Sequence, residues 1–416
     1  MATRIIIHTT SDWVPSHPSI YVEDEHEMKP LRGIRVLDLS RLVAGGLTGM
    51  LLADFGADVV KVEQPGTGDP LRSWTMEGLP LWWKVYGRGK RYVTLNIQSD
   101  EGRSILLRLL PHFDVLMESL VPGALERYGL GWDVLHANNR RLVMLRISGW
   151  GSGGPGADRP GFGTLVEAGT GFAAMNGDAD RPPVLPSFPL ADMTSGLYAA
   201  NAIMFALYHR DVHGGEGQHI DVSLFESLFS LLGPIPAEYA ALGTIRTRQG
   251  NRSANTGPRG CFRTADGHWI AVSASTPKMA ERFMRGYGLE PLLDDERFAT
   301  NEARVRHAEQ LDAAIRDAIG MRTLAANMEI INSNRLTAHP VQTIADIERD
   351  EHWRARQLTV DVGAVRMHNV VPRLSATPGE IKWPGGNLGE HNEEIYCGEL
   401  HLTPADLDSL RSRGVI

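Results

Sequence analysis

Cysteine is scarce in this chain and long apolar runs are missing, and each absence excludes a class of protein. Only 2 of the 416 residues are cysteines, Cys261 and Cys397, and they lie far apart in the sequence. A disulfide framework and a zinc site built on paired cysteines are therefore not expected. The apolar segments are interrupted before they reach membrane-spanning length, and Ile5–Ile7 is too short a run for a secretory signal. The sequence thus predicts a cytoplasmic protein that does not bind a membrane.

An excess of positive charge is also missing. The formal net charge is -8, so no overall positive field favours nucleic acid as a partner. With 42% hydrophobic residues, a chain of this length can bury one large core or two moderate ones. The composition is that of an ordinary soluble globular protein.

Strand and helix patterns alternate along the first half of the chain. We expect strands at 34–39, 58–63, 112–117 and 141–147, and helices at 46–55, 99–110 and 124–137. Such alternation predicts an α/β fold with a parallel sheet. The predicted organisation is an N-terminal extension (1–30), a large domain (31–232), a smaller α+β domain with linkers (233–340) and a return to the large domain (341–416).

Glycine-rich and basic segments follow several predicted strands, at the edge where parallel sheets bind ligands. The loop 148–156 contains Gly149, Gly151 and Gly153, whose backbone N–H groups could stabilise an oxyanion, although a flexible surface loop is an equal alternative. Five basic residues form a candidate phosphate patch, while each one alone is more typical of a solvated surface charge: Arg72, Arg88, Lys90, Arg91 and Arg127.

Other motifs are weaker. The segment Ala44-Gly-Gly-Leu-Thr-Gly49, with Glu63 ending the next strand, is a degenerate dinucleotide fingerprint and leaves an oxidoreductase as a minor alternative. No nucleophile elbow of a serine hydrolase is present. The histidines His209, His213 and His219 lack partners at metal-ligand spacing, so no metal site is predicted.

Asp192 precedes the apolar stretch Leu197 to Tyr208. An aspartate in this context most often caps a helix, and that needs no catalysis. The same position would also keep the carboxylate ionised, because helix-start N–H groups favour negative charge, and an ionised carboxylate is a usable nucleophile.

Ordered segments across the chain resemble the class III CoA-transferases, the family of formyl-CoA and carnitine CoA-transferases. The similarity is carried by Leu31-Arg-Gly-Ile-Arg-Val-Leu-Asp-Leu39, Leu51-Leu-Ala-Asp-Phe-Gly-Ala-Asp-Val-Val-Lys-Val-Glu63, Pro122-Gly-Ala-Leu-Glu-Arg127, Ala157-Asp-Arg-Pro-Gly-Phe162 and Gly217-Gln-His-Ile-Asp221. It implies a Rossmann-like large domain, a small domain and an interlocked homodimer. It also implies that Asp192 is the nucleophile and passes CoA through an aspartyl-CoA thioester, with a CoA thioester as substrate and no permanently bound cofactor.

The resemblance also implies where CoA binds. The position of Arg127 contacts CoA in this family, and Val43, Leu120 and Trp150 lie near its cleft. The full set of predicted CoA contacts is Val43, Ala44, Arg72, Lys90, Arg91, Leu120, Arg127 and Trp150.

The chain departs from the formyl-CoA enzymes, which have Gln at the position of Val43 and Tyr at that of Trp150, and this argues against formate or oxalate. Dicarboxylates are attractive acids, because Arg41, Arg159 or Arg259 could hold a second carboxylate. The 2-methylacyl-CoA racemases of the same family pair the aspartate with a His-Asp step where this chain has Phe162-Gly163. Transfer is therefore favoured, with racemisation as the alternative.

Overall fold

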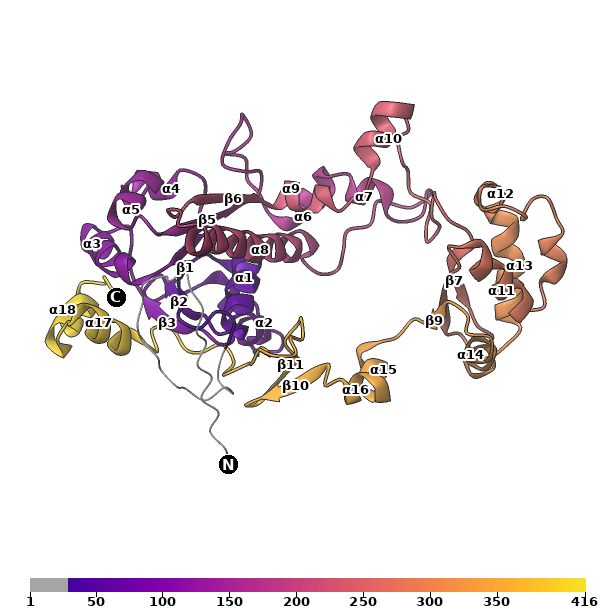
Figure 1. Ribbon diagram of the computed structural model, residues 1–416. Helices are drawn as coiled ribbons and strands as arrows, with labels where there is room; N and C mark the ends of the chain where they lie inside the picture. Colours follow the sequence, from indigo (N-terminus) through magenta and orange to yellow (C-terminus); the bar gives the residue numbers. More distant parts are fainter. Residues whose placement is uncertain (1–28) are drawn as a thin grey trace, which may run out of the picture.

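The computed structural model describes residues 29–416, so residues 1–28 of the predicted N-terminal extension lie outside the described part. The chain forms a large domain and a small domain connected by extended segments (Figure 1). None of the helices in the described part is long and apolar enough to cross a membrane.

A six-stranded sheet forms the centre of the large domain, and every neighbouring pair of strands is parallel. The strand order, β3-β2-β1-β4-β5-β6, is that of a Rossmann-like doubly wound sheet. The predicted parallel α/β sheet is thus confirmed. The strands are β1 (Arg35–Leu39), β2 (Asp58–Glu63), β3 (Arg91–Thr94), β4 (Val115–Glu118), β5 (Val143–Ser148) and β6 (His219–Ser223).

Helices cover both faces of this sheet because successive strand residues point to opposite sides. In β1, Val36 belongs to a core shared with Ala44 and Ala199, whereas Leu37 belongs to a core shared with Leu106 and Ile395. The first core lies under α1 (Leu42–Asp54), α6 (Gly163–Gly169), α8 (Leu190–Val212) and α9 (Leu224–Ser230). The second lies under α3 (Asp100–Leu109), α5 (Trp132–Asn138), α17 (Asn392–Leu400) and α18 (Pro404–Ser412).

The end of the chain packs on the same sheet as its beginning. Tyr396 and Ile416 are buried in the core that contains Leu37. In Figure 1 the C-terminus accordingly lies beside α3. The connecting elements are α2 (Leu81–Tyr86), α4 (Ala124–Arg127), α7 (Phe172–Met175), α10 (Ile235–Leu242), α15 (Ile344–Arg349), α16 (Glu351–Ala355) and the antiparallel pair β10 (Thr359–Val362) and β11 (Val365–His368).

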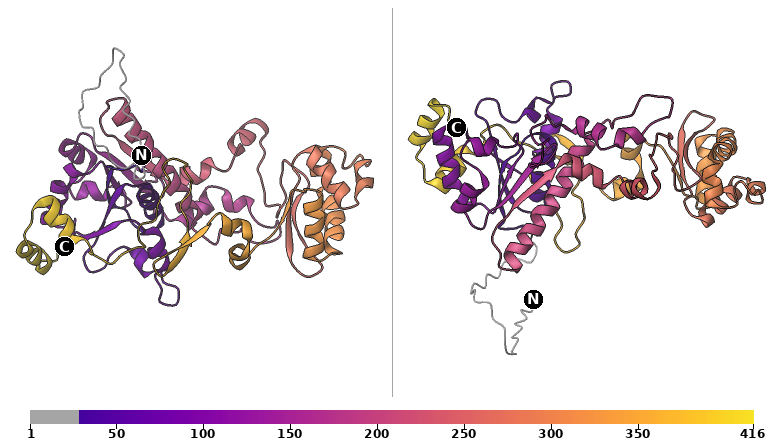
Figure 2. Two further views of the ribbon diagram at one scale, coloured as in Figure 1. Left: turned by 60° about the horizontal axis from the view of Figure 1, so that its bottom comes forward. Right: turned by 90° about the horizontal axis from the view of Figure 1, so that it is seen from above.

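The small domain has its own core, centred on Ile270, Phe283 and Ile315. Its three-stranded antiparallel sheet has the order β7-β8-β9, and helices pack on it at a distance from the large domain (Figure 2). The elements are β7 (Arg259–Arg263), β8 (Trp269–Ser273), β9 (Ala338–Pro340), α11 (Pro277–Gly286), α12 (Asn301–Arg306), α13 (Ala308–Gly320) and α14 (Leu324–Ser333).

Some predicted elements differ from the observed ones. The helix predicted at 124–137 is two helices, because the chain turns at Gly129, where φ is +70°. Strand β3 was not predicted; it has four residues and begins with a charged one, Arg91. Helix α1 begins at Leu42, earlier than the predicted residue 46, because the N–H of Leu42 donates to the Asp69 carboxylate at 3.1 Å.

Candidate active site

Asp192 lies inside the first turn of α8 and does not cap it. The helix begins at Leu190, and its N-cap, Pro189, makes no side-chain capping hydrogen bond. The prediction that Asp192 precedes the helix is therefore wrong, because Leu190 and the buried Ala191 already have helical backbone. The Asp192 carboxylate thus projects from a helical backbone, with helical residues both before and after it in the sequence.

The first turns of α8 are held against α1 by a close backbone approach. A Cβ atom at Gly196 would lie 2.9 Å from the carbonyl oxygen of Ala44, so a side chain there would push the helices apart. Thr48 Oγ1 donates to the carbonyl oxygens of Ala44 (2.9 Å) and Gly196 (3.3 Å). Met193 packs on the apolar cluster that contains Val43. Two predicted CoA contacts, Val43 and Ala44, are therefore buried beside the turn that carries Asp192.

On its other side, Asp192 approaches the start of α6, where Gly163 has no side chain. A methyl group at Gly163 would overlap Asp192 Oδ2, so the glycine provides the space that the carboxylate occupies. The preceding residue, Phe162, is the N-cap of α6 and is 63% exposed. This is the position where the racemase resemblance requires a histidine. The position therefore lacks the base that two-base proton exchange needs.

A second carboxylate, Glu167 of α6, lies near Asp192. Its side chain is only 2% exposed, and its Oε1 accepts a hydrogen bond from the N–H of Ala191 at 3.2 Å. Burial and the negative charge of Glu167 raise the pKa of Asp192 to about 6, although its own backbone N–H opposes the shift. The helix start, which the sequence indicates would favour the charged form, is thus outweighed by burial and Glu167, although a carboxylate with a pKa of about 6 is still ionised at neutral pH. Sequence reasoning missed Glu167, whose only signal is a lone acid between the apolar residues Val166 and Ala168.

The glycine-rich loop after β5 is braced by side chains. The N–H of Gly151 donates to Ser148 Oγ at 3.0 Å, and that of Ser152 donates to Asp221 Oδ2 at 2.8 Å. The N–H of Gly151 is thus already used and does not form part of an oxyanion hole in this structure. A Cβ atom at Gly149 would lie 2.6 Å from Gly161 Cα, so Gly149 serves close backbone packing, whereas Gly153 has open space around it.

Trp150 in the same loop anchors it to the large domain. The ring contacts Phe225 at a centroid distance of 5.7 Å, and its Nε1 donates to the carbonyl oxygen of Pro160 at 3.1 Å. The indole is half-buried against the core that contains Ala191. Trp150 therefore joins the loop to the neighbourhood of the Asp192 turn.

A pocket of about 230 Å³, here named the strand-end pocket, opens at the carboxyl ends of β1, β2 and β3 and beyond β4. Leu120 and Arg127, two predicted CoA contacts, line it. This is the edge at which doubly wound sheets bind ligands. Sequence reasoning did not place Gln64, Ile97 or Tyr128 there. The lining residues are Leu39, Arg41, Val62, Glu63, Gln64, Leu95, Ile97, Gln98, Leu120, Val121, Ala124, Arg127 and Tyr128.

The predicted phosphate patch does not assemble, because most of its cations are paired within the protein. Arg72 forms two hydrogen bonds of 2.7 Å to Glu63, and Arg88 binds Asp54. Arg91 binds Asp58 and Glu394. Only Arg127 of this set lines the strand-end pocket. Glu63, the acid that a dinucleotide site would place on ribose, is likewise engaged by Arg72.

Lys90 belongs to a group of buried charges that we name the buried ion cluster: Asp38, Lys61, Asp69 and Lys90. Lys90 Nζ lies 3.0 Å from Asp38, and Lys61 Nζ lies 3.1 Å from Asp69. Both lysines are almost completely buried. Burial would raise the pKa of Asp38, but the lysine charges outweigh it and the pKa is lowered. Lys90 therefore has a structural role in place of the predicted contact with CoA.

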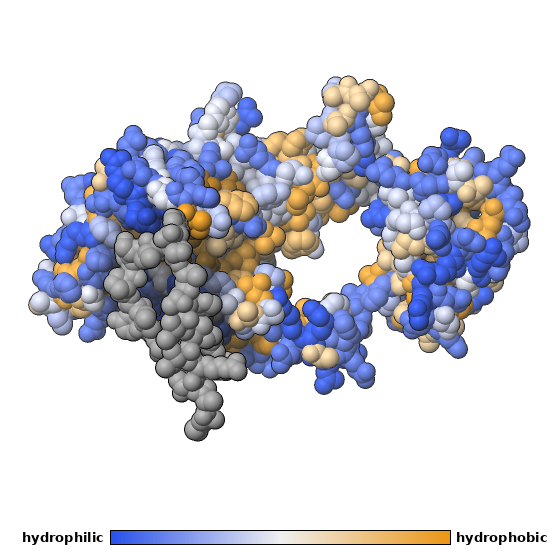
Figure 3. Space-filling model, in the orientation of Figure 1, coloured by the Kyte–Doolittle hydropathy of each residue, from blue (hydrophilic) through white to orange (hydrophobic). Residues whose placement is uncertain are grey.

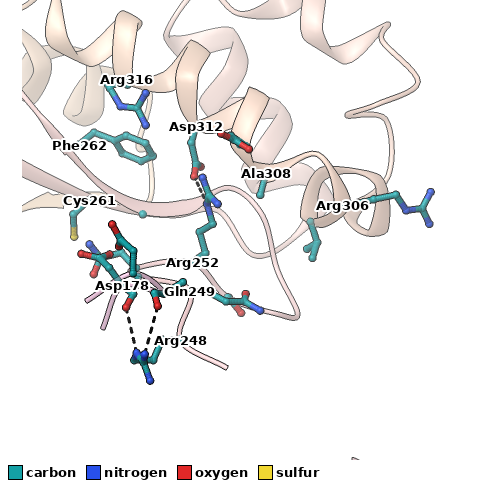
Figure 4. Close-up of a pocket in the computed structure, with 18 residues that line it drawn as sticks. Asp178, Arg248, Gln249, Arg252, Cys261, Phe262, Arg306, Ala308, Asp312 and Arg316 are labelled. Carbon is teal, nitrogen blue, oxygen red and sulfur yellow. Dashed lines mark hydrogen bonds and ion pairs between the residues drawn. The ribbon is translucent and has the colours of Figure 1, made fainter. Parts of the chain in front are cut away.

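A second cavity, of about 610 Å³, lies at the junction with the small domain (Figure 4). Acidic and basic side chains line it together. Arg252 binds Asp312 at 2.7 Å, and Arg248 donates to the carbonyl oxygen of Asp178 at 3.2 Å. The lining contains none of the predicted site residues. Four arginines and four acidic residues line this cavity, so the lining has no net positive charge for an anion.

The doubly wound sheet and the strand-end pocket together define the class of α/β proteins that bind a ligand beyond the carboxyl ends of their strands. Residues 31–392 match CoA-transferase family III, so the chain belongs to this family and is a class III CoA-transferase. It is 40% identical over 400 residues to succinyl-CoA--D-citramalate CoA-transferase of Chloroflexus aurantiacus, covering 93% of this chain and 98% of that protein.

Two further relatives extend the comparison. The chain is 33% identical over 387 residues to succinate--glutarate CoA-transferase of Agrobacterium fabrum, covering 88% of this chain and 95% of that protein. Among solved structures, a CAIB/BAIF family protein from Brucella suis has a TM-score of 0.79 at 31% identity, covering 89% of this chain and 99% of that one. The family that the sequence resembles is therefore confirmed.

Proposed function

We propose that this enzyme transfers CoA from an acyl-CoA, such as succinyl-CoA, to a small dicarboxylic acid, with Asp192 as the nucleophile. The observation that carries the proposal is the setting of Asp192, a half-buried carboxylate in a fixed helical turn with space made for it by Gly163. With a pKa of about 6, Asp192 is ionised at neutral pH and more basic than an ordinary aspartate. The names of the relatives support succinyl-CoA as donor and a dicarboxylate as acceptor.

The reaction exchanges one activated acyl bond for another. Asp192 attacks the donor thioester, forming a mixed anhydride and releasing CoA thiolate. The thiolate attacks the aspartyl carbonyl, which gives an aspartyl-CoA thioester and releases the donor acid. The acceptor carboxylate attacks this thioester and again expels CoA thiolate. The thiolate then attacks the acceptor's carbonyl, which releases the new acyl-CoA and restores Asp192. Charge and atoms balance without ATP, a metal or a resident cofactor.

Among the three arginines considered for the second carboxylate of the acid, Arg159 has the most suitable position. Arg159 is exposed and lies four residues before Gly163. Arg41 lines the strand-end pocket, and Arg259 donates to the carbonyl oxygens of Asn251 and Arg252. We therefore assign Arg159 to the acid, and Arg41 with Arg127 to the phosphates of CoA.

We also propose that the chain forms an interlocked homodimer. The space-filling view has an opening through the molecule between the two domains, with apolar side chains beside it (Figure 3). Helix α8 exposes Leu197, Tyr198, Phe205, Tyr208 and Val212, a stripe too apolar for a face in water. A second copy that passes through the opening would cover it. Light scattering after gel filtration should give the mass of two chains.

Trapping of the covalent intermediate tests the proposed function. The enzyme is incubated with succinyl-CoA and then treated with hydroxylamine, and the peptide that contains Asp192 should gain the mass of a hydroxamate. Asp192→Ala should lose both the adduct and the transfer activity, whereas the matched variant Asp133→Ala, on the exposed start of α5, should keep them. Full activity of Asp192→Ala would exclude Asp192 as the nucleophile.

Racemisation is separated by a second measurement on the same enzyme. Two-base proton exchange predicts uptake of solvent deuterium at the α-carbon of a 2-methylacyl-CoA with no acceptor acid present. Because Phe162 stands where the racemases have histidine, we expect no uptake. Deuterium incorporation at a rate comparable to CoA transfer would favour the racemase.

A further inference from the structure

Glu167 is a buried acid that the proposed mechanism does not use. Its side chain is 2% exposed, and its one hydrogen bond given by the structure goes to the backbone of another helix. A buried carboxylate without a cation is costly to keep. The fold nevertheless places this one on α6, within electrostatic reach of Asp192.

We propose that Glu167 is a positioning residue that holds the first turn of α8 in place and, through its charge, drives Asp192 from the free carboxylate into its covalent form. This inference rests on the proposed function, because it concerns the same nucleophile. It assigns Glu167 no bond to substrate.

The positioning part follows from the hydrogen bond to Ala191. The first N–H groups of a helix have no partner within the helix, and the side chain of the N-cap residue, Pro189, has no acceptor atom to supply one. Glu167 Oε1 accepts the N–H of Ala191 at 3.2 Å from the neighbouring helix. The residue that is held directly precedes Asp192, so the tether fixes the backbone from which the nucleophile projects.

The electrostatic part of the proposal follows from the groups that shift the pKa of Asp192, which include an acid and no cation. Burial and Glu167 raise the pKa of Asp192, and within residues 29–416 no lysine or arginine contributes to that shift. The other titratable groups on the elements packed against α8 are not among the causes of the shift: Asp54 on α1, Arg146 on β5, His219 and Asp221 on β6, and Glu226 on α9.

The repulsion favours the covalent states of the reaction. Free Asp192 carries a negative charge beside Glu167, whereas the anhydride and the aspartyl-CoA thioester are neutral at this position. Acylation therefore removes the repulsion between the two side chains. The equilibrium shifts toward the thioester by the same factor by which Glu167 raises the proton affinity of Asp192.

Two variants separate the charge from the tether. Glu167→Gln keeps an acceptor for the N–H of Ala191 and removes the charge. Glu167→Asp keeps the charge and is one methylene too short for the tether. Glu226→Gln is the matched control, because it makes the same change on α9, another helix packed against α8.

The readouts are the pH profile of kcat/KM and the fraction of enzyme held as aspartyl-CoA at a fixed ratio of succinyl-CoA to succinate, measured by intact-protein mass spectrometry. For Glu167→Gln we expect the acid limb to move to lower pH and the covalent fraction, as a ratio to free enzyme, to fall about fivefold. For Glu167→Asp we expect a lower kcat with the acid limb kept in place.

Clear results would overturn the inference. If Glu167→Gln has the wild-type pH profile and covalent fraction, or if Glu226→Gln changes them equally, the charge of Glu167 has no special role. If Glu167→Gln does not fold, the acid limb of Glu167→Asp decides, because a shift there to lower pH contradicts the proposal. Either failure leaves Asp192 trapping unaffected, whereas an active Asp192→Ala would remove the proposed function itself.

Discussion

Two carboxylate sites of the large domain, the buried ion cluster and the start of α8, differ in their partners. In the buried ion cluster, Asp38 is surrounded by Lys61 and Lys90, and their charges lower its pKa. At the start of α8, Asp192 has Glu167 as its neighbour, and its pKa is raised to about 6. The same kind of side chain is therefore stabilised as an anion in one place and destabilised in the other.

This difference separates the carboxylates that stabilise the fold from the carboxylate that can react with an acyl-CoA. Lys61 donates to the carbonyl oxygen of Ser40, and Asp69 accepts the N–H of Leu42, so the buried ion cluster fixes the turn from β1 into α1. A carboxylate that is paired with cations is not relieved of any electrostatic repulsion when it is acylated. A carboxylate opposed by another acid loses an unfavourable charge when it is acylated.

The largest expected effect is on activity. Asp192→Asn keeps the shape of the side chain and removes the nucleophile, so kcat should fall by at least about 10³-fold. Steady-state assays with succinyl-CoA check this. A loss of less than tenfold would mean that Asp192 does not differ functionally from the carboxylates of the buried ion cluster.

The second effect concerns stability. Lys61→Met leaves Asp38 and Asp69 with less positive charge in a buried site, and the free energy of unfolding should fall by about 3–5 kcal/mol. Urea denaturation measures it, with Lys278→Met on the exposed start of α11 as the control. An unchanged unfolding midpoint would remove the structural role that separates the two groups.

A smaller effect is expected at the gap beside Asp192. Gly163→Ala places a methyl group where Asp192 Oδ2 lies, and the displaced carboxylate should lower kcat/KM by about 100-fold. Gly398→Ala on α17, where an added Cβ atom meets nothing, serves as the control. Wild-type kinetics in Gly163→Ala would show that the position of the carboxylate is not critical.

The smallest effect is a gain in stability in the variant that loses activity. The folded-state pKa of Asp192 is about 6, above that of an unfolded aspartate, so this group lowers stability as the pH rises from about 4 to 6. Asp192→Asn should therefore be more stable than the wild type by about 1–2 kcal/mol at pH 7.5, and the gain should vanish near pH 4. Thermal unfolding at both pH values tests the sign.

The sequence predicted most regular elements because their patterns are local. Strand β2 has the predicted bounds, since an apolar run is readable from neighbouring residues alone. Charge pairing is not local. Arg91 meets Glu394 across 303 positions, and Lys90 meets Asp38 across 52, so no inspection of the basic residues could show that they were already engaged.

The candidate site was predictable in part for the same reason. Asp192 is marked by its own segment and by the family resemblance. Glu167 is not, because its significance comes from the packing of α6 against α8. The direction of the Asp192 pKa shift could not be predicted either, since the sequence reveals the helix start but not the acid that folds beside it.

The missing side chain at Gly163 constrains how this enzyme could change its chemistry during evolution. Introducing a histidine at Phe162 would supply a base, and the racemase pattern also requires an aspartate at 163. That aspartate would occupy the space of the Asp192 carboxylate. The two patterns therefore differ by two substitutions, and the one at 163 would displace the Asp192 carboxylate from its present position.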